Sequence, residues 1–172
     1  MDSKIKTLTI FSFTILSLVF AGCTQNKWAD WKVQNEAWLA QKSKESGIKK
    51  TDSGLLYKII ADPTPQAACP NMTSTIVCDY TVKLINGYKV DGGNYVSLDL
   101  NSTIPGFTEA CHKIHEHGDI EFYVPAELGY DNLKYVGNDY YNAEGFGTEG
   151  TQSYIPPYSA LIYTVHICSV IE

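Results

Sequence analysis

The segment CHKIHEHG at residues 111–118 holds a dense group of side chains that could ligate a metal. His112 and His115 are spaced i, i+3, and Glu116 and His117 stand beside them. A metal site needs ligands that converge on one face, and this spacing matches neither H-E-x-x-H nor H-x-x-E-H. Histidines at the solvated end of a helix also suit the C-terminal dipole. We therefore expect a helix end here, and no metal site.

The first 23 residues, MDSKIKTLTIFSFTILSLVFAGC, predict an export signal that ends in a lipidation site. Two lysines precede an apolar run from Leu8 to Phe20, which is too short to span a membrane. Ala21-Gly22-Cys23 follows, and small residues directly before a cysteine resemble the lipobox of bacterial lipoproteins. An ordinary cleaved signal peptide is the alternative. A lipid on Cys23 would anchor the chain in the cell envelope, and we expect the outer membrane, facing the periplasm.

Four further cysteines could form disulfides in an exported chain: Cys69, Cys78, Cys111 and Cys168. Two bridges with three possible connectivities are allowed, and the pairing stays open. Cys78 and Cys168 fall within strand patterns, so they could equally be small buried thiols. A nucleophilic pair of Cys111 with the distant His166 has no local support in the sequence.

Composition indicates one globular domain after the export signal. About 150 residues remain, which is the size of an ordinary domain. Hydrophobic residues make up 44% of the chain, which is sufficient for a core. The formal net charge is −6 and the sequence contains no basic cluster, so we expect no nucleic-acid partner.

Alternating apolar and polar residues predict several antiparallel strands. The strongest alternation spans residues 74–93, where Asn86-Gly87 is a signal for a hairpin turn. At the C-terminus, Pro156-Pro157 precedes another alternating run, because proline cannot donate ladder hydrogen bonds. Further short strands are expected at 54–60, 95–100 and 120–130, the last broken by a proline. These strands predict an α+β domain.

Two helices and one long loop complete the expected elements. Apolar residues at helical spacing predict an N-terminal tether helix that ends near Gly47: Trp28, Trp31, Trp38 and Leu39. We expect this helix to pack on the domain, although it could instead present tryptophan to a partner. A short helix is expected within 104–118, entered through Pro105-Gly106. Residues 131–153 form a loop longer than most connections, which favours a functional role such as covering a pocket.

The order of these pieces resembles the FKBP-type peptidyl-prolyl isomerases. The family pattern runs Y-x-G-x-L-x-x-G-x-x-F-D-S-S, V-I-x-G-W, I-P-x-x-L-A-Y-G and I-P-P-x-(A/S)-x-L-x-F-x-V. This chain has NGYKVDGG, IPGF, VPAELGY and IPPYSALIYTVHI in the same order. The resemblance implies a twisted antiparallel sheet wrapped around one short α-helix. It divides the chain into a signal peptide (1–22), a lipidated N-terminus with the tether helix (23–52) and an isomerase domain (53–172).

The resemblance also implies the activity, which is rotation about the peptide bond before proline in polypeptide substrates. That bond is slow to rotate because its barrier is ~18–20 kcal/mol. The reaction needs no nucleophile and no cofactor. We expect a lipid-anchored isomerase that assists the folding of exported proteins. The alternative is an FKBP-fold chaperone or binding module with weak catalysis or none.

Site residues follow from the same alignment. The resemblance assigns catalysis to Tyr80, Asp91, Ile104 and Tyr130. It assigns substrate binding to Val90, Tyr95, Thr103, Phe107, Ile155 and Tyr163. Several positions depart from the family pattern: Val90 replaces phenylalanine, Gly92-Gly93 replaces Ser-Ser, Phe107 replaces tryptophan and Asp131 replaces glycine. The loss of an aromatic wall at Val90 leads us to expect a wider pocket.

Overall fold

The computed structural model describes residues 28–63, 66–130 and 154–171 of the chain. The export signal with Cys23 and the long loop at 131–153 lie outside these described residues. The elements, in chain order, are α1 (Ala29–Lys42), β1 (Lys49–Lys50), β2 (Leu56–Ala61), β3 (Thr75–Leu84), β4 (Lys89–Asp99), the 3-10 helix η1 (Leu100–Ser102), α2 (Pro105–Cys111), β5 (Asp119–Val124), the 3-10 helix η2 (Ala126–Leu128) and β6 (Leu161–Ile171).

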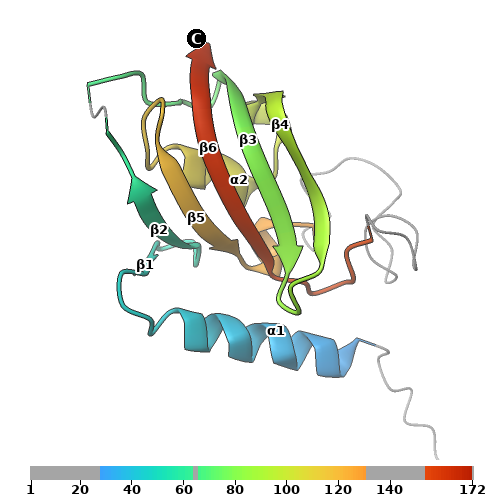
Figure 1. The fold of residues 1–172 in the computed structure, drawn as a ribbon. Helices are drawn as coiled ribbons and strands as arrows, with labels where there is room; N and C mark the ends of the chain where they lie inside the picture. Colours follow the sequence, from blue (N-terminus) through green and yellow to red (C-terminus); the bar gives the residue numbers. More distant parts are fainter. Residues whose placement is uncertain (1–27, 64–65, 131–153, 172) are drawn as a thin grey trace, which may run out of the picture.

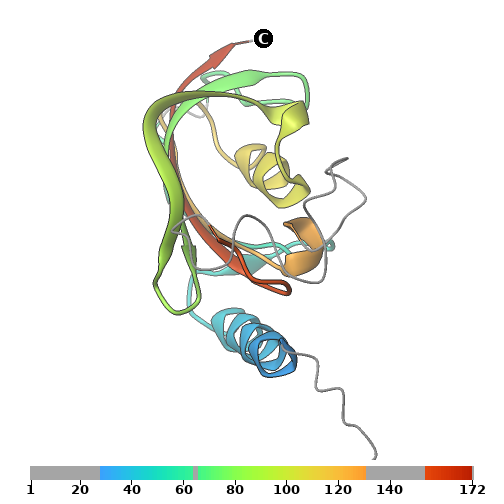
Figure 2. The same ribbon diagram turned by 90° about the vertical axis from the view of Figure 1, so that its right-hand side faces the viewer.

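Strands β1 to β6 form one antiparallel sheet in the order β1-β2-β5-β6-β3-β4 (Figure 1). The sheet curves, and α2 lies in its concave side (Figure 2). Alternate residues of β6 are buried from Leu161 to Ile167, as the sequence pattern predicts. They belong to the same core cluster as the buried residues of α2, which include Phe107. The predicted α+β fold, a twisted antiparallel sheet around one short helix, is confirmed.

Strand β4 is continuous where the sequence pattern predicted two strands. The hairpin at Asn86-Gly87 is as predicted, and Gly87 has a φ of +84°, which suits glycine. Strand β4 then continues through Gly92-Gly93 to Asp99. The two glycines pair in register with Thr81 and Tyr80 of β3, and the register shifts on either side of them, at Val90 and at Asn94-Tyr95. A Cβ on Gly92 would stand 2.7 Å from the Tyr80 carbonyl oxygen. The irregularities that flank the glycines have the one-residue shift of a β-bulge, which bends the strand without ending it.

Both helices end earlier than predicted. Helix α1 ends at Lys42, so Gly47 is not its C-cap and lies in the following turn. Helix α2 ends at Cys111, and all four histidine and glutamate candidates follow it, His112 as the C-cap and the other three in a loop. In that loop the Nδ1 atom of His115 forms a hydrogen bond with a carboxylate oxygen of Asp62 at 3.0 Å. This hydrogen bond lowers the pKa of Asp62. Across the described residues, no group of three or more His, Cys, Asp or Glu side chains could hold a metal.

Helix α1 packs on the domain, as predicted. The indole of Trp38 meets the ring of Tyr123 edge-on, with centroids 5.6 Å apart. Near the other end of the helix, the Trp31 Nε1–H donates to the Ser159 hydroxyl at 2.9 Å. Between them the Asn35 side chain is 2% exposed, and its Oδ1 accepts the backbone N–H of Ala160 at 2.8 Å. The helix is therefore joined to the segment just before β6.

The cysteines that the structure describes are all free thiols. Cys78 and Cys111 are buried, and burial raises the pKa of Cys78 to about 12 and that of Cys111 well above its usual value. Both therefore stay protonated and behave as small core residues.

Within the described part of the chain, no helix is long and apolar enough to cross a membrane.

Replacing Asn35 by alanine tests the joint between α1 and the segment before β6. The Ala160 N–H would lose its acceptor in a buried place, so we expect Asn35→Ala to cost about 1–3 kcal/mol of unfolding free energy. Chemical denaturation measures the difference. Glu36→Ala is the matched control, because Glu36 is exposed on the same helix and forms an ion pair with Lys32 at 3.8 Å. The control should change stability by less than about 0.5 kcal/mol. Equal effects of the two substitutions would contradict the joint.

Candidate functional site

A pocket of about 280 Å³ opens between β3, β4, β6 and the start of α2. It brings together residues that the sequence placed in a site from five separate segments: Tyr80, Asp91, Thr103, Ile104, Phe107, Tyr130 and Tyr163. The curved sheet supplies Tyr80, Asp91 and Tyr163, and the turn after η2 supplies Tyr130. The convergence follows from the curvature, because the concave side of the sheet faces the N-terminal end of α2.

Aromatic rings from the core form one wall of the pocket. Phe107 is 2% exposed and Tyr163 is 4% exposed. The Tyr163 ring stacks on Phe122 with centroids 4.9 Å apart, and Phe107 meets both rings edge-on at 5.5 and 5.8 Å. These contacts fix the rings, so the wall is a rigid apolar surface.

Hydroxyl groups and one carboxylate form the polar side of the pocket. The Tyr80 hydroxyl donates to Asp91 at 3.0 Å, and the other Asp91 oxygen accepts the Gly92 N–H at 2.7 Å. Burial, with the Asp91 hydrogen bond and charge, raises the pKa of Tyr80 to about 12. Burial also raises the pKa of Tyr130, and the charge of Asp91 adds to it. Both tyrosines therefore keep their protons at neutral pH and can act as hydrogen-bond donors.

Backbone groups at the start of α2 add a second kind of donor. Ile104 caps the helix, and its carbonyl accepts the N–H groups of Phe107 and Thr108 at 3.0 and 3.2 Å. Among the hydrogen bonds of the described residues, none uses the Ile104 N–H. The Thr103 hydroxyl, by contrast, already donates to the Leu100 carbonyl at 3.0 Å. Ile104 therefore offers a main-chain donor at the pocket, whereas the Thr103 hydroxyl is occupied.

Three residues that the sequence placed in the site do not line this pocket. Val90 and Ile155 are each 5% exposed and belong to the hydrophobic core. Tyr95 is 77% exposed, with a φ of 53°, and its N–H donates to Asp79 at 2.7 Å. A phenylalanine at position 90 would therefore crowd the core instead of narrowing the pocket. The wider pocket expected from valine at this position has no support in this geometry.

Sequence reasoning missed three residues that line the pocket: Leu98, Asn101 and Ser102. Leu98 pairs with Ile76 near the end of β4, and the 3-10 helix η1 carries the other two. A prediction of one continuous strand over residues 89–99 would have placed Leu98 on β4, opposite Ile76 of the strand that carries Tyr80. Asn101 and Ser102 lie between β4 and α2, where they line the same pocket.

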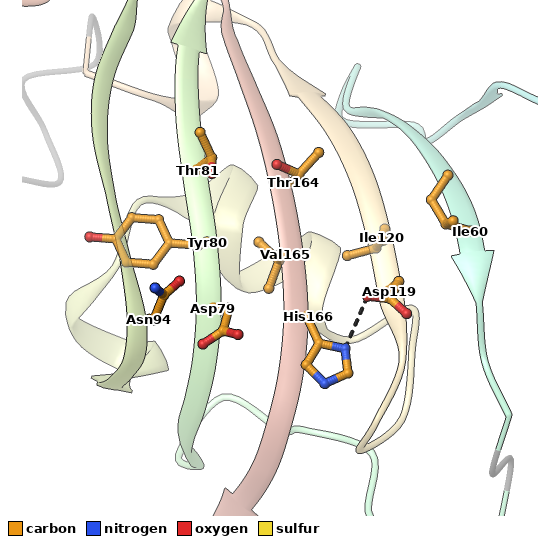
Figure 3. A pocket seen from close by; sticks show the side chains of 10 residues that line it. All are labelled: Ile60, Asp79, Tyr80, Thr81, Asn94, Asp119, Ile120, Thr164, Val165 and His166. Carbon is orange, nitrogen blue, oxygen red and sulfur yellow. Dashed lines mark hydrogen bonds and ion pairs between the residues drawn. The ribbon is translucent and has the colours of Figure 1, made fainter.

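A second hollow, of about 320 Å³, lies on the other face of the sheet (Figure 3). Polar side chains such as Asp79 and Thr164 surround it, and the Nδ1 atom of His166 lies 2.9 Å from Asp119. Cys111 is buried on α2, across the sheet, so the structure does not bring it together with His166 as a nucleophilic pair. Tyr80 lines this hollow too, but Phe107, Tyr130 and Tyr163 of the first pocket are not among the described residues that line it, so it has no comparable aromatic wall. We therefore take the pocket at Tyr80, Asp91 and Tyr130 as the candidate site.

Comparisons with known proteins agree with this fold. The family profile described as FKBP-type peptidyl-prolyl cis-trans isomerase matches residues 67–168. A second profile, described as the domain amino terminal to FKBP-type peptidyl-prolyl isomerase, matches residues 21–59.

Individual relatives extend the similarity over most of the chain. The FKBP-type peptidyl-prolyl cis-trans isomerase FkpA of Escherichia coli strain K12 is 28% identical over 146 residues, covering 83% of this chain and 47% of that protein. The outer membrane protein MIP of Legionella longbeachae is 30% identical over 143 residues, covering 81% of this chain and 54% of that protein. The chain thus spans about half the length of these relatives.

The crystal structure of FkpA from Escherichia coli superposes with a TM-score of 0.68 and 27% sequence identity, covering 83% of this chain and 60% of that one. The first family profile alone covers more than half of the chain, from the loop before β3 into β6. The chain belongs to the family of FKBP-type peptidyl-prolyl cis-trans isomerases.

Proposed function

We propose that this chain is a peptidyl-prolyl cis-trans isomerase that acts on proline-containing polypeptides and assists the folding of exported proteins. The observation that carries the proposal is the pocket itself, where a rigid aromatic wall faces protonated tyrosine hydroxyls and a main-chain donor. A proline ring is apolar and rigid and suits the aromatic wall. The carbonyls on either side of it need donors, which Tyr130 and Ile104 supply.

The rate enhancement requires no covalent step. A planar amide is stabilised by resonance and separates charge between its nitrogen and oxygen, whereas the twisted amide at the top of the barrier has lost that conjugation. An apolar wall disfavours the charge-separated planar form relative to the twisted form. Donors at fixed positions hold the flanking carbonyls while the bond rotates, so binding energy favours the transition state.

The alternative is a member of the family that binds unfolded chains without accelerating isomerisation. The replacement of Ser-Ser by Gly92-Gly93 favours it, because these glycines depart from the family pattern directly after Asp91. The long segment at 131–153, which we expect to contact client proteins, is compatible with either activity. Measured isomerisation separates the two functions.

We also propose that a lipid on Cys23 anchors the protein in the outer membrane, facing the periplasm. The small residues before Cys23 and the apolar run before them support this. The name of the Legionella longbeachae relative places that protein in an outer membrane. On this proposal residues 1–22 are removed, and the tether in 23–52 leads through α1 to the isomerase domain at 53–172.

Loss of the Tyr130 hydroxyl should slow isomerisation. We expect Tyr130→Phe to lower kcat/KM for a short Xaa-Pro peptide about two- to tenfold, because one neutral hydrogen bond is lost while the ring still packs. A protease-coupled or NMR-exchange assay measures the rate. Tyr95→Phe is the control, since that hydroxyl is exposed outside the pocket. If the wild-type protein shows no rate above the uncatalysed reaction, the binding module is the correct function.

Lipidation should depend on Cys23. We expect Cys23→Ser to yield unprocessed or soluble protein, because serine cannot accept the thioether-linked lipid. Membrane fractionation followed by mass spectrometry measures both partition and chain length. The opposite result, a variant of mature length that still partitions with membranes, would rule out the lipid anchor.

A further inference from the structure

Helix α1 contacts the back of the two strands that carry the aromatic wall of the pocket. Phe122 of β5 pairs with Tyr163 of β6, and their rings stack in the core, on the concave side of the sheet. The next pair, Tyr123 with Ile162, faces the other way, because side chains alternate along a strand. Tyr123 is 3% exposed, and Trp38 of α1 packs edge-on against its ring. This contact is therefore one residue pair away from the stacked rings.

A cation strengthens the contact between α1 and β5. The Nζ atom of Lys42, the last residue of α1, lies 5.0 Å from the ring centroid of Tyr123 and 5.3 Å from that of Trp38. An ammonium group over an aromatic face is attracted by the ring quadrupole. The same Nζ atom lies 2.9 Å from a carboxylate oxygen of Glu45, which keeps the lysine in place. The C-terminal half of α1 is thus fixed to β5.

The N-terminal half of α1 is fixed to the turn that leads into β6. Trp31 donates its Nε1–H to the Ser159 hydroxyl at 2.9 Å, and this hydroxyl donates to the Pro156 carbonyl at 2.7 Å. The Asn35 Oδ1 atom accepts the N–H of Ala160, the residue directly before β6. Asn35 is 2% exposed, and its Nδ2 atom donates to the Trp31 carbonyl at 2.8 Å. Buried hydrogen bonds from α1 therefore fix the point at which β6 begins.

The backbone of this turn needs such support. Tyr158 has a φ of +62°, a left-handed conformation that residues other than glycine avoid unless surrounding contacts impose it. Lys32 of α1 supplies one contact, since its Nζ atom lies 5.0 Å from the Tyr158 ring centroid. Trp28, the N-cap of α1, supplies another, with its ring centroid 6.2 Å from that of Tyr154. Helix α1 thus contacts the turn along most of its length.

We propose that α1 belongs to the catalytic unit, and that Asn35 and Trp38 are positioning residues that keep the Phe122 and Tyr163 rings in place for the substrate proline. This inference rests on the proposed function and goes beyond it, because it places the start of the active unit at α1 instead of at residue 53. Contacts to β5 and to the start of β6 restrain both strands from the back. Close-packed interiors transmit small displacements, and misplacement of groups that contact a substrate slows the reaction.

Point variants of the whole protein test the effect on isomerisation. We expect Trp38→Ala and Asn35→Ala each to lower kcat/KM for an Xaa-Pro peptide about two- to tenfold. Trp38→Phe should restore most of the rate, because it keeps a ring against Tyr123. All rates are measured at a temperature at which every variant is folded.

Asp62→Ala is the control for general destabilisation. This substitution removes the hydrogen bond to His115, which lies beyond the C-terminal end of α2, whereas the pocket opens at the start of that helix. We expect it to lower the denaturation midpoint and to leave kcat/KM unchanged. A loss of kcat/KM as large as that of Asn35→Ala would assign both effects to stability and overturn the positioning role.

Ring-flip rates give a readout that does not depend on activity. With labelled phenylalanine and tyrosine rings, NMR measures how often the rings of Phe122 and Tyr163 flip. Both rates should rise in Trp38→Ala and in Asn35→Ala, because the stacked pair is less restrained, and should stay at the wild-type value in Asp62→Ala.

The two readouts separate this inference from the proposed function. Unchanged flip rates in both α1 variants would overturn the coupling between the helix and the aromatic wall, whatever the activity. Raised flip rates with an unchanged kcat/KM would overturn the role of α1 in catalysis. A wild-type protein without isomerase activity would refute the proposed function, and with it that role, while the flip rates would still decide whether α1 restrains the wall.

Discussion

The packing of one short helix into a curved sheet is the constraint on which the rest of this structure depends. Helix α2 is seven residues long and cannot be stable alone, so its formation requires the apolar face of the sheet. Phe107 provides the contact, by meeting Phe122 and Tyr163 at the centre of the concave side. Two of these three rings also line the pocket. Stability and the candidate site therefore share the same residues, and a substitution in the aromatic wall affects both.

Curvature of the sheet is what turns this core into an open pocket. Register shifts on either side of Gly92-Gly93 bend β4, and the Gly92 N–H donates to the Asp91 carboxylate that accepts the Tyr80 hydroxyl. Glycine is required at position 92 because its φ is +152° and a Cβ would collide with the Tyr80 backbone. The glycines that depart from the family pattern thus have a structural role here. They do not by themselves indicate that the site has decayed.

Hydrogen bonds of buried polar residues fix the N-terminal helix α1 to the domain. The described residues include three buried polar side chains. Two of them, Asn35 and Ser159, lie in the contact between α1 and the segment before β6. Buried polar groups of this kind fix one arrangement, because any shift leaves a donor without an acceptor. If Cys23 carries a lipid, the anchor is connected to the domain through a helix that is held in place. The orientation of the pocket relative to α1 is then set by this contact.

The sequence alone determined the class of the fold, the strand faces and most of the residues that surround the pocket. Period-two alternation is a local property, so the buried face of β6 and the hairpin at Asn86-Gly87 could be predicted from it. What only the tertiary structure decided depends on contacts between distant segments. A glycine pair can end a strand or lie within it, and here the pairing of β3 with β4 continues the strand through the glycines, with a bend at the register shifts on either side of them. That bend places Leu98 on the pocket, while the core encloses Val90 and solvent surrounds Tyr95. Tyr163 and Tyr130 likewise come to line one pocket only when β6 and the turn after η2 meet, because no local pattern relates residues so far apart in the chain.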